Sequence, residues 1–246
     1  MKKHIPNFIT LLNLLSGLIA CIYAFDDNIL MAFIWVCIGI FFDYWDGFLA
    51  RILQVKSELG LQLDSLADMV TSGVVPGLII YKQLANIQET QGPYNLTPET
   101  YYMAIVPYIG FLITLGAAYR LAKFNIDTRQ TDSFIGLPTP GNALFILSLP
   151  LIVSTTNSEA VISFLSNPYV LVIISVLSAY IMNAELPLFS LKIDPKNIGA
   201  YKLQLGFVAA SILLLIVLHY LAIPLIILLY ILLSIIKNMT AKKQIA

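Results

Sequence analysis

The sequence predicts an all-α integral membrane protein with about eight transmembrane helices. Of its 246 residues, 59% are hydrophobic and 11% are charged, and the mean hydropathy is +0.84. Soluble domains contain about 25% charged residues. The apolar residues also gather in runs close to the roughly 20 residues that a helix needs to cross a bilayer. The predicted spans are residues 6–25, 29–52, 63–82, 102–122, 141–157, 168–185, 204–221 and 222–237.

The first span is expected to remain in the mature protein. Its apolar run is too long for the core of a secretory signal, and no small-residue cleavage site follows it. The short polar connector Asp26–Asn28 leads to the second span. Another short segment, 53–60, joins the second span to the third, so these two helices are predicted to be antiparallel neighbours.

Polar or helix-breaking segments separate the later spans. The longest predicted polar loop, Gln83–Thr100, lies between the third and fourth spans. Pro138 and Pro140 mark a break before the fifth span, because a residue that precedes proline disfavours the α conformation. The last two spans are expected to form a hairpin that is broken near Pro224. No shift in composition marks a domain boundary, so one transmembrane domain over 1–246 is predicted.

The cations fall almost entirely on one side of this arrangement. Lysine and arginine concentrate in the cytoplasmic loops of membrane proteins. Of the 14 Lys and Arg residues, Lys82 alone lies on the opposite side. The others are Lys2, Lys3, Arg51, Lys56, Arg120, Lys123, Arg129, Lys192, Lys196, Lys202, Lys237, Lys242 and Lys243. Both termini are therefore predicted to be cytoplasmic, in the inner (plasma) membrane of a cell.

Overall charge and cysteine content exclude several classes of function. The net charge is zero, so the chain has no global basic field, and no nucleic-acid partner is expected. Cys21 and Cys37 lie inside apolar stretches without a C-x-x-C pattern, which excludes a disulfide scaffold and a thiolate zinc site. Both are expected to be small buried side chains.

Four aspartates lie inside predicted spans, where ionisable groups are costly and usually functional. Asp43 and Asp46 belong to the second span, and Asp64 and Asp68 to the third. Spacings of three and four residues place each pair on one face of its helix. Carboxylates that converge in one hairpin repel one another unless cations neutralise them. All-oxygen ligands suit Mg²⁺, Mn²⁺ or Ca²⁺, and four aspartates are enough for a pair of metal ions.

Small residues and a cation accompany the aspartates. Gly47 and Ala50 lie on the aspartate face of the second span, and Gly60 lies one turn before the aspartates of the third. A minimal side chain there would let a bulky phosphate group reach the helix backbone. Packing is the competing interpretation, because small residues also allow membrane helices to approach closely. Arg51 is a permanent cation whose planar fork suits phosphate oxygens.

Residues 43–51 read DYWDGFLAR, and residues 60–68 read GLQLDSLAD. This stretch resembles the D-x2-D-G-x2-A-R-x8-G-x3-D-x3-D signature of the CDP-alcohol phosphotransferase family, with every fixed position present. The resemblance implies that family's helical bundle and the transfer of a substituted phosphate from a CDP-linked donor to an alcohol, with release of CMP. It implies Asp68 as the base that deprotonates the alcohol. It also implies two Mg²⁺ or Mn²⁺ ions held by Asp43, Asp46, Asp64 and Asp68.

A second family element lies at the N-terminus. Pro6, Asn7 and Thr10 reproduce the pattern P-N-x-x-T that members share. The resemblance implies that this element and the aspartate signature together bind the CDP moiety and its diphosphate. The implied contacts are Asn7, Thr10, Asp46, Gly47, Ala50, Arg51 and Gly60.

Further segments resemble the bacterial and archaeal phosphatidylserine synthases. These segments are NLLSG from Asn13, SLADMVTSGVVP at 65–76, YRLAKFN at 119–125 and GLPTP at 136–140. The resemblance implies CDP-diacylglycerol as donor, L-serine as acceptor and a homodimer. Candidate contacts for the serine carboxylate or the lipid phosphate are Arg120, Lys123 and Asn125, at the cytoplasmic end of the fourth span. The competing interpretation is that Arg120 and Lys123 are only the positive charges that commonly flank the cytoplasmic end of a transmembrane helix.

Two other functions stay open. The same chemistry could use glycerol 3-phosphate or inositol phosphate as the acceptor. A cation transporter would also place aspartates inside the membrane. Transporters usually carry repeated halves around such a site, whereas the aspartate motif occurs once in this sequence, and Arg51 lies beside it.

Overall fold

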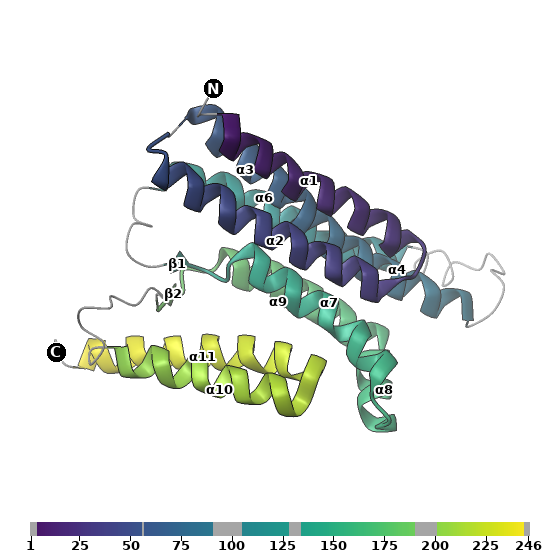
Figure 1. Ribbon diagram of the computed structural model, residues 1–246. Helices are drawn as coiled ribbons and strands as arrows, with labels where there is room; N and C mark the ends of the chain where they lie inside the picture. The colour runs from purple at the N-terminus through teal and green to yellow at the C-terminus, as the bar shows by residue number, and fades with distance from the viewer. Residues whose placement is uncertain (1–3, 56, 91–104, 128–133, 190–200, 244–246) are drawn as a thin grey trace.

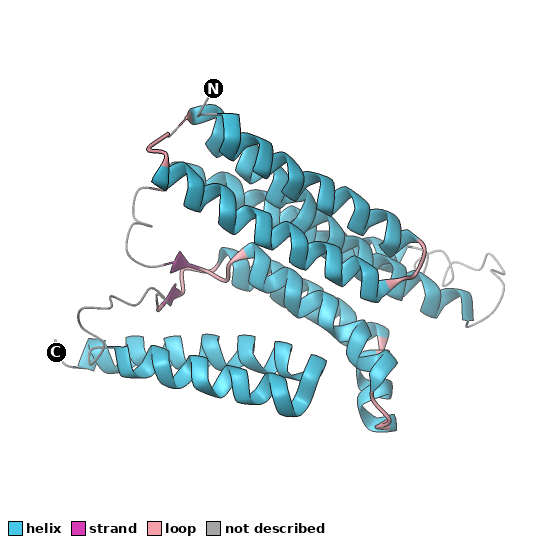
Figure 2. Ribbon diagram, viewed as in Figure 1, coloured by secondary structure: helices cyan, strands magenta, loops and turns pink. Residues whose placement is uncertain are grey.

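The computed structural model describes residues 4–55, 57–90, 105–127, 134–189 and 201–243. Nearly all of them are helical, which confirms the predicted all-α class (Figure 2). Two strands of two residues each, β1 (Phe134–Ile135) and β2 (Pro187–Leu188), pair antiparallel, and no sequence pattern predicted them. The beginning of the predicted span 102–122 lies outside the described residues.

Helices α1 (His4–Phe25) and α2 (Ile29–Ile52) lie side by side as an antiparallel pair (Figure 1). Their bounds agree closely with the first two predicted spans. The turn between them ends at Asn28, whose side-chain oxygen accepts a hydrogen bond from the backbone N–H of Met31 at 3.2 Å. This N-cap satisfies one of the donors that the first turn of a helix leaves unpaired.

The third helical rod has three parts. It begins with α3 (Glu58–Asp68), continues through the π-helical segment η1 (Met69–Val74) and ends with α4 (Val75–Thr90). The polar loop predicted to begin at Gln83 is wrong at its start, because α4 continues to Thr90. Residues 83–90 read QLANIQET, which contains neither glycine nor proline to stop the helix.

The next helices complete the body of the bundle. They are the 3-10 helix η2 (Val106–Gly110), α6 (Phe111–Ile126), α7 (Thr139–Thr155), α8 (Glu159–Leu165) and α9 (Pro168–Asn183). Residues 158–167 lie between two predicted spans, but they contain α8, which is bent by 61° from α9. One apolar core joins α1, α2, α4 and α7 through Ala20, Val36, Ile79 and Leu147. A second joins α4, α6, α7 and α9 through Leu84, Ile113, Ile146 and Leu171.

Helices α10 (Lys202–Leu218) and α11 (Ala222–Lys243) lie side by side, apart from the α1 and α2 pair (Figure 1). The 3-10 helix η4 (His219–Leu221) reverses the chain between them, and His219 has a left-handed φ of 51°. The chain therefore turns at the junction of the last two predicted spans. The hydroxyl of Tyr230 on α11 donates to the carbonyl oxygen of Phe189 at 2.8 Å, which ties the hairpin to the segment after β2.

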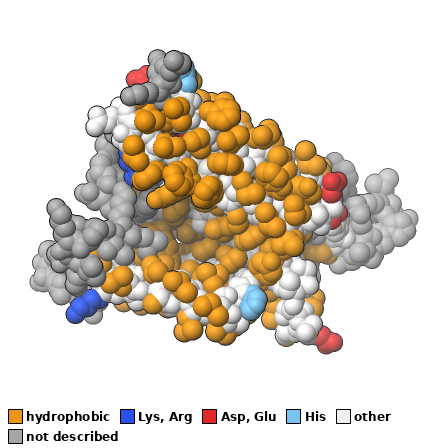
Figure 3. Space-filling model, viewed as in Figure 1, with side chains coloured by type: hydrophobic (Ala, Val, Ile, Leu, Met, Phe, Trp, Pro, Cys, Tyr) orange, Lys and Arg blue, Asp and Glu red, His pale blue; other side chains and the backbone are white. Residues whose placement is uncertain are grey.

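The chain is a membrane protein by the length and composition of its helices. Within the described residues, four helical segments are long and apolar enough to cross a bilayer: His4–Phe25, Ile29–Ile52, Glu58–Ile87 and Lys202–Thr240, the last of which contains the α10 and α11 hairpin. The bent pair α8 and α9 adds a fifth if it forms one span, and α7 is apolar but shorter. Apolar side chains cover the face seen in Figure 3. The count of eight spans stays a prediction.

Candidate active site

Three carboxylates converge between α2 and α3. One oxygen each from Asp43, Asp46 and Asp64 lies within 4.8 Å of the others. Asp46 is buried, with 6% of its surface exposed, and the other two are half-buried. Asp43 and Asp46 of α2 therefore meet Asp64 of α3, while α1 packs against both helices. Such a group of oxygen ligands could hold a divalent cation.

Asp68 lies one helical turn beyond Asp64 and is not part of this three-residue group. Its Oδ1 accepts a hydrogen bond from Nδ2 of Asn13 at 3.0 Å. It also lies within electrostatic range of Asp64, of Asp46 and of the guanidinium of Arg120. Asp68 thus has an amide and a cation near it, which distinguishes it from the other three aspartates.

A pocket of about 560 Å³ opens beside the carboxylates. Residues of α1, of α2, of α3 and of the connection between α2 and α3 line it. They are Pro6, Asn7, Thr10, Asp46, Gly47, Ala50, Val55, Ser57, Glu58, Gly60, Leu61 and Asp64. Every CDP contact implied by the family resemblance is in this lining except Arg51. The two sequence elements that carry the resemblance therefore meet at one cavity.

The two glycines of the pocket have different roles. A Cβ added to Gly47 would meet no atom within 4 Å, so the missing side chain leaves open space against the backbone of α2. A Cβ added to Gly60 would lie 3.0 Å from Oγ of Ser57 and 3.1 Å from Oδ1 of Asn7. Close packing therefore explains Gly60, whereas Gly47 leaves room for a bound group.

Thr10 orients one of the carboxylates. Its hydroxyl donates to Oδ2 of Asp46 at 2.5 Å, and both residues are buried. Ionised acceptors form short, strong hydrogen bonds. The family resemblance implies that Thr10 contacts CDP, and the structure adds a contact with a candidate metal ligand.

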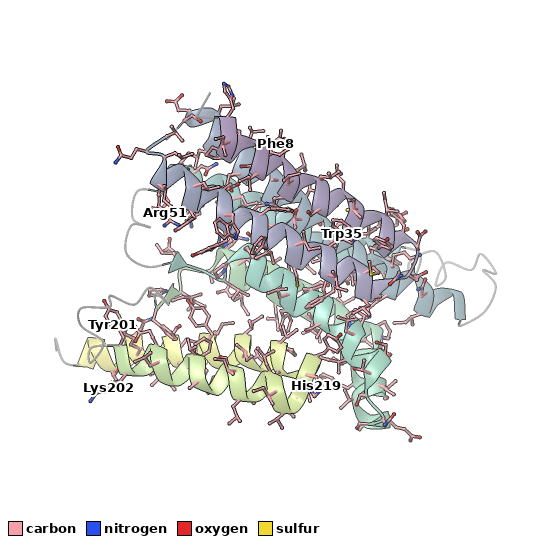
Figure 4. All side chains as sticks on the ribbon, in the orientation of Figure 1. Phe8, Trp35, Arg51, Tyr201, Lys202 and His219 are labelled. Atoms are coloured by element: carbon pink, nitrogen blue, oxygen red, sulfur yellow. The ribbon has the colours of Figure 1, made fainter. Side chains whose placement is uncertain are left out.

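Arg51 is exposed at the end of α2 (Figure 4). Its Nε donates to the carbonyl oxygen of Gly47 at 3.0 Å, one turn back along its own helix. In this position it does not line the pocket.

The three residues predicted to contact the acceptor, Arg120, Lys123 and Asn125, have different neighbours in the structure. Arg120 is buried, with 8% of its surface exposed, and its Nη2 donates to the carbonyl oxygen of Gly136 at 3.3 Å. Nζ of Lys123 lies 3.8 Å from Oε1 of Glu185. Nδ2 of Asn125 donates to Oγ of Ser65 at 2.9 Å. Arg120 is therefore held by the Gly136 carbonyl within electrostatic range of Asp68, and the other two side chains contact residues outside the aspartate cluster.

Several buried polar atoms have no hydrogen-bond partner in the described part of the chain. Among them are Nε of Arg120, Oδ1 of Asn125 and Oγ of Ser72, four residues after Asp68. Burying a polar group without a partner costs about 1–3 kcal/mol. A polar substrate could satisfy an unpaired donor and an unpaired acceptor of this kind.

Asn13 and Thr71 were not among the predicted site residues. Thr71 donates to Oδ1 of Asn13 at 2.8 Å, and Asn13 in turn donates to Asp68. The sequence does contain a signal for Asn13, because it is a polar residue in an apolar helix and lies three positions after Thr10 on the same face. The contact with Thr71 joins residues 58 positions apart, and no local pattern predicts it.

Residues 3–183 match the family of CDP-alcohol phosphatidyltransferases. The chain is 36% identical over 152 residues to the CDP-diacylglycerol–serine O-phosphatidyltransferase of Bacillus subtilis (strain 168), covering 59% of this chain and 76% of the relative. It is 33% identical over 144 residues to the protein of that name from Helicobacter pylori (strain J99), covering 58% of this chain and 55% of the relative. The archaetidylserine synthase of Methanothermobacter thermautotrophicus is 28% identical over 176 residues, which are 70% of this chain and 66% of the relative.

The matched region contains the aspartate hairpin, the pocket and Arg120, and it ends at Asn183, the last residue of α9. The chain belongs to the CDP-alcohol phosphatidyltransferase family.

Proposed function

We propose that this chain transfers the phosphatidyl group of CDP-diacylglycerol to the hydroxyl of L-serine and so forms phosphatidylserine and CMP. The observation that carries the proposal is the group formed by Asp43, Asp46 and Asp64 beside a pocket that Gly47 keeps open. The names of the Bacillus and Helicobacter relatives specify serine as the acceptor.

The donor set fits divalent metal ions. Three carboxylate oxygens within 4.8 Å of one another would repel strongly without a cation, and oxygen ligands suit Mg²⁺ and Mn²⁺. We propose that Asp43, Asp46 and Asp64, with Asp68 beside them, hold two such ions. When bound, the ions would neutralise the diphosphate and stabilise the CMP phosphate as it leaves.

The chain's own residues would bind the donor and move one proton. Gly47 and Ala50 let the diphosphate approach α2, while Asn7, Thr10 and Gly60 form the facing wall of the pocket. Asp68 accepts the proton of the serine hydroxyl. A bond forms between the serine oxygen and the phosphatidyl phosphorus, the bond from that phosphorus to CMP breaks, and CMP leaves with the electron pair. Arg51 would contact phosphate oxygens by turning from the Gly47 carbonyl to the pocket.

The acceptor site is proposed around Arg120. Serine carries a carboxylate and an ammonium group beside its hydroxyl. The unpaired Nε of Arg120 would donate to the carboxylate, and the unpaired Oδ1 of Asn125 would accept from the ammonium group. Lys123 would add positive charge at the entrance, beside its contact with Glu185.

We propose one transmembrane domain over 1–246 with eight spans, both termini cytoplasmic and the pocket open to the cytoplasm. Support comes from the cations: Arg51 and Lys202 both lie toward the left of Figure 4, and His219 lies toward the right. Lys82 belongs to the opposite end, where its Nζ lies 3.0 Å from Oδ2 of Asp27 in the turn between α1 and α2. We propose the inner (plasma) membrane as the location, and the charge pattern supports the orientation across it. The homodimer rests on the family resemblance.

The experiment is an acceptor panel on the purified protein in lipid nanodiscs. CMP release from CDP-diacylglycerol is measured with Mg²⁺ and with L-serine, glycerol 3-phosphate or inositol phosphate in turn. We expect rapid CMP release with serine and background release with the other two. Faster release with glycerol 3-phosphate or inositol phosphate would overturn the serine assignment and leave the family assignment in place.

A further inference from the structure

A chain of buried hydrogen bonds links α1 to Asp68 and to the π-helical segment. Asn13 is fully buried, with 0% of its surface exposed. Its Nδ2 donates to Oδ1 of Asp68 at 3.0 Å, and its Oδ1 accepts from Oγ1 of Thr71 at 2.8 Å. Thr71 is also buried and belongs to η1, which begins directly after Asp68. Both ends of the Asn13 amide are therefore engaged.

The chemistry of donors and acceptors fixes the direction of each hydrogen bond in this series. An ionised carboxylate only accepts hydrogen bonds, so the amide nitrogen of Asn13 must face Asp68 and the amide oxygen must face Thr71. The Thr71 hydroxyl, which lies 2.8 Å from this oxygen and 3.1 Å from the backbone carbonyl oxygen of Asn13, supplies the donor that the amide oxygen needs. Without that hydroxyl, the buried amide oxygen of Asn13 loses its side-chain partner. The amide is then no longer held in the orientation in which its nitrogen donates to Asp68.

Two glycines make room for the hydrogen-bonded side chains of Asn13 and Thr71. A Cβ added to Gly39 on α2 would lie 2.6 Å from Cγ2 of Thr71 and 2.9 Å from Oδ1 of Asn13. A Cβ added to Gly17 on α1 would lie 3.0 Å from Cα of Thr71. Both distances to Thr71 are too short for ordinary packing. The glycines thus allow α1, α2 and η1 to close around these two polar side chains.

We infer that Asn13 is a positioning residue that acts through Asp68, with Thr71 fixing the orientation of its amide. This inference rests on the proposed role of Asp68 as the base. The hydrogen bond from Asn13 to Oδ1 would fix the orientation in which the Asp68 carboxylate receives the proton of the serine hydroxyl. Helix α1 then serves two carboxylates from one face: Thr10 donates to Asp46, and Asn13, one turn later, donates to Asp68.

A pair of Thr71 variants separates this role from packing. Thr71→Val removes the hydroxyl and keeps the volume, whereas Thr71→Ser keeps the hydroxyl and loses a methyl group. We expect Thr71→Val to lower kcat for serine-dependent CMP release at least about tenfold, as losses of supporting hydrogen bonds typically do. The KM for CDP-diacylglycerol should change little. Thr71→Ser should keep most of the wild-type kcat.

A double-mutant cycle tests whether Asn13 acts through Asp68. Asn13→Ala is introduced into the wild type and into Asp68→Asn, and kcat is measured for all four proteins. If the inference holds, Asn13→Ala lowers kcat in the wild type and has little further effect once Asp68 is changed. Ser16→Ala is the matched control, because Ser16 is also buried on α1 and its hydroxyl donates to the backbone of Leu12 at 2.8 Å. It should retain wild-type kcat.

The outcomes are distinguishable. Additive losses in the cycle, or equal losses in Thr71→Val and Thr71→Ser, would overturn the inference and assign Asn13 and Thr71 to packing alone. If Asn13→Ala does not fold, or Asp68→Asn leaves no measurable rate, the Thr71 pair decides. A wild type that releases CMP with an alcohol other than serine would contradict the proposed acceptor. The same variants would then test the inference with that alcohol.

Discussion

The hydroxyl of Thr10 donates a 2.5 Å hydrogen bond to Oδ2 of Asp46, which joins α1 to the aspartate face of α2 across 36 residues of sequence. This contact connects the N-terminal element to the aspartate signature. Partners of this kind orient a metal ligand and tune its affinity for the ion. The effect of Thr10 on metal binding can therefore be tested separately from its effect on donor binding.

Changing Thr10 to Val should weaken metal binding. The substitution keeps the side-chain volume and removes the donor to Asp46, so the concentration of Mg²⁺ that gives half-maximal activity should rise about 10–100-fold. Thr10→Ser keeps the donor and should stay near the wild type. Mg²⁺ titrations of CMP release measure both variants. Equal Mg²⁺ requirements for Thr10→Val and the wild type would mean that this hydrogen bond does not affect the metal site.

Neutralising any one of the clustered carboxylates should abolish most activity. We expect Asp43→Asn, Asp46→Asn and Asp64→Asn each to reduce kcat by about 10² or more, because each removes a charged ligand from the diphosphate clamp. Asp26→Asn makes the same change at an exposed position in the turn between α1 and α2, and it should have no effect. A folded variant of the cluster with near-normal turnover would remove that residue from the proposed ligand set.

Gly47→Ala should impair donor binding without harming the fold. The added Cβ meets no protein atom within 4 Å but projects into the pocket, so the KM for CDP-diacylglycerol should rise. Because alanine favours a helix over glycine by about 0.5–1 kcal/mol, thermal stability should be unchanged or higher. Gly206→Ala on α10 is a matched control, since a Cβ there also meets nothing within 4 Å and Gly206 does not line the pocket. Similar KM values for both variants would show that the donor does not approach Gly47.

Arg120→Ala should affect the acceptor more than the donor. Loss of the guanidinium removes the proposed partner of the serine carboxylate, so the KM for serine should rise while the KM for CDP-diacylglycerol changes little. Lys123→Ala should show a smaller effect, because its ammonium group already lies near Glu185. A KM for serine that is unchanged in Arg120→Ala would place the acceptor site elsewhere.

The sequence predicted the parts of this protein that depend on local periodicity. Long apolar runs located α1 and α2, and the spacing of Asp43 and Asp46 gave their shared face. Helix ends were less predictable: α4 extends past Gln83 because the following residues include neither glycine nor proline and because Leu84 among them packs into the core. The spread of Lys123 and Asn125 to different partners follows from helical geometry, because residues two apart do not share a face.

Contacts between distant segments could not be predicted in this way. The hydrogen bond from Asn13 to Asp68 joins residues 55 positions apart, and it depends on how α1 packs against α3. The π-helical segment Met69–Val74 likewise reflects packing: the carbonyl oxygen of Gly73 within it accepts from the hydroxyl of Thr114 on α6 at 2.9 Å. Such features require the assembled bundle, since a single helix carries no signal for them.

The most direct test of the central claim is incorporation of isotopically labelled L-serine into lipid by the purified protein with CDP-diacylglycerol. We predict labelled phosphatidylserine and an equal amount of CMP in the presence of Mg²⁺ or Mn²⁺, loss of both products in excess EDTA and their return when Mg²⁺ is restored in excess. Full activity in EDTA would contradict the metal site at Asp43, Asp46 and Asp64. CMP release without labelled lipid would contradict serine as the acceptor.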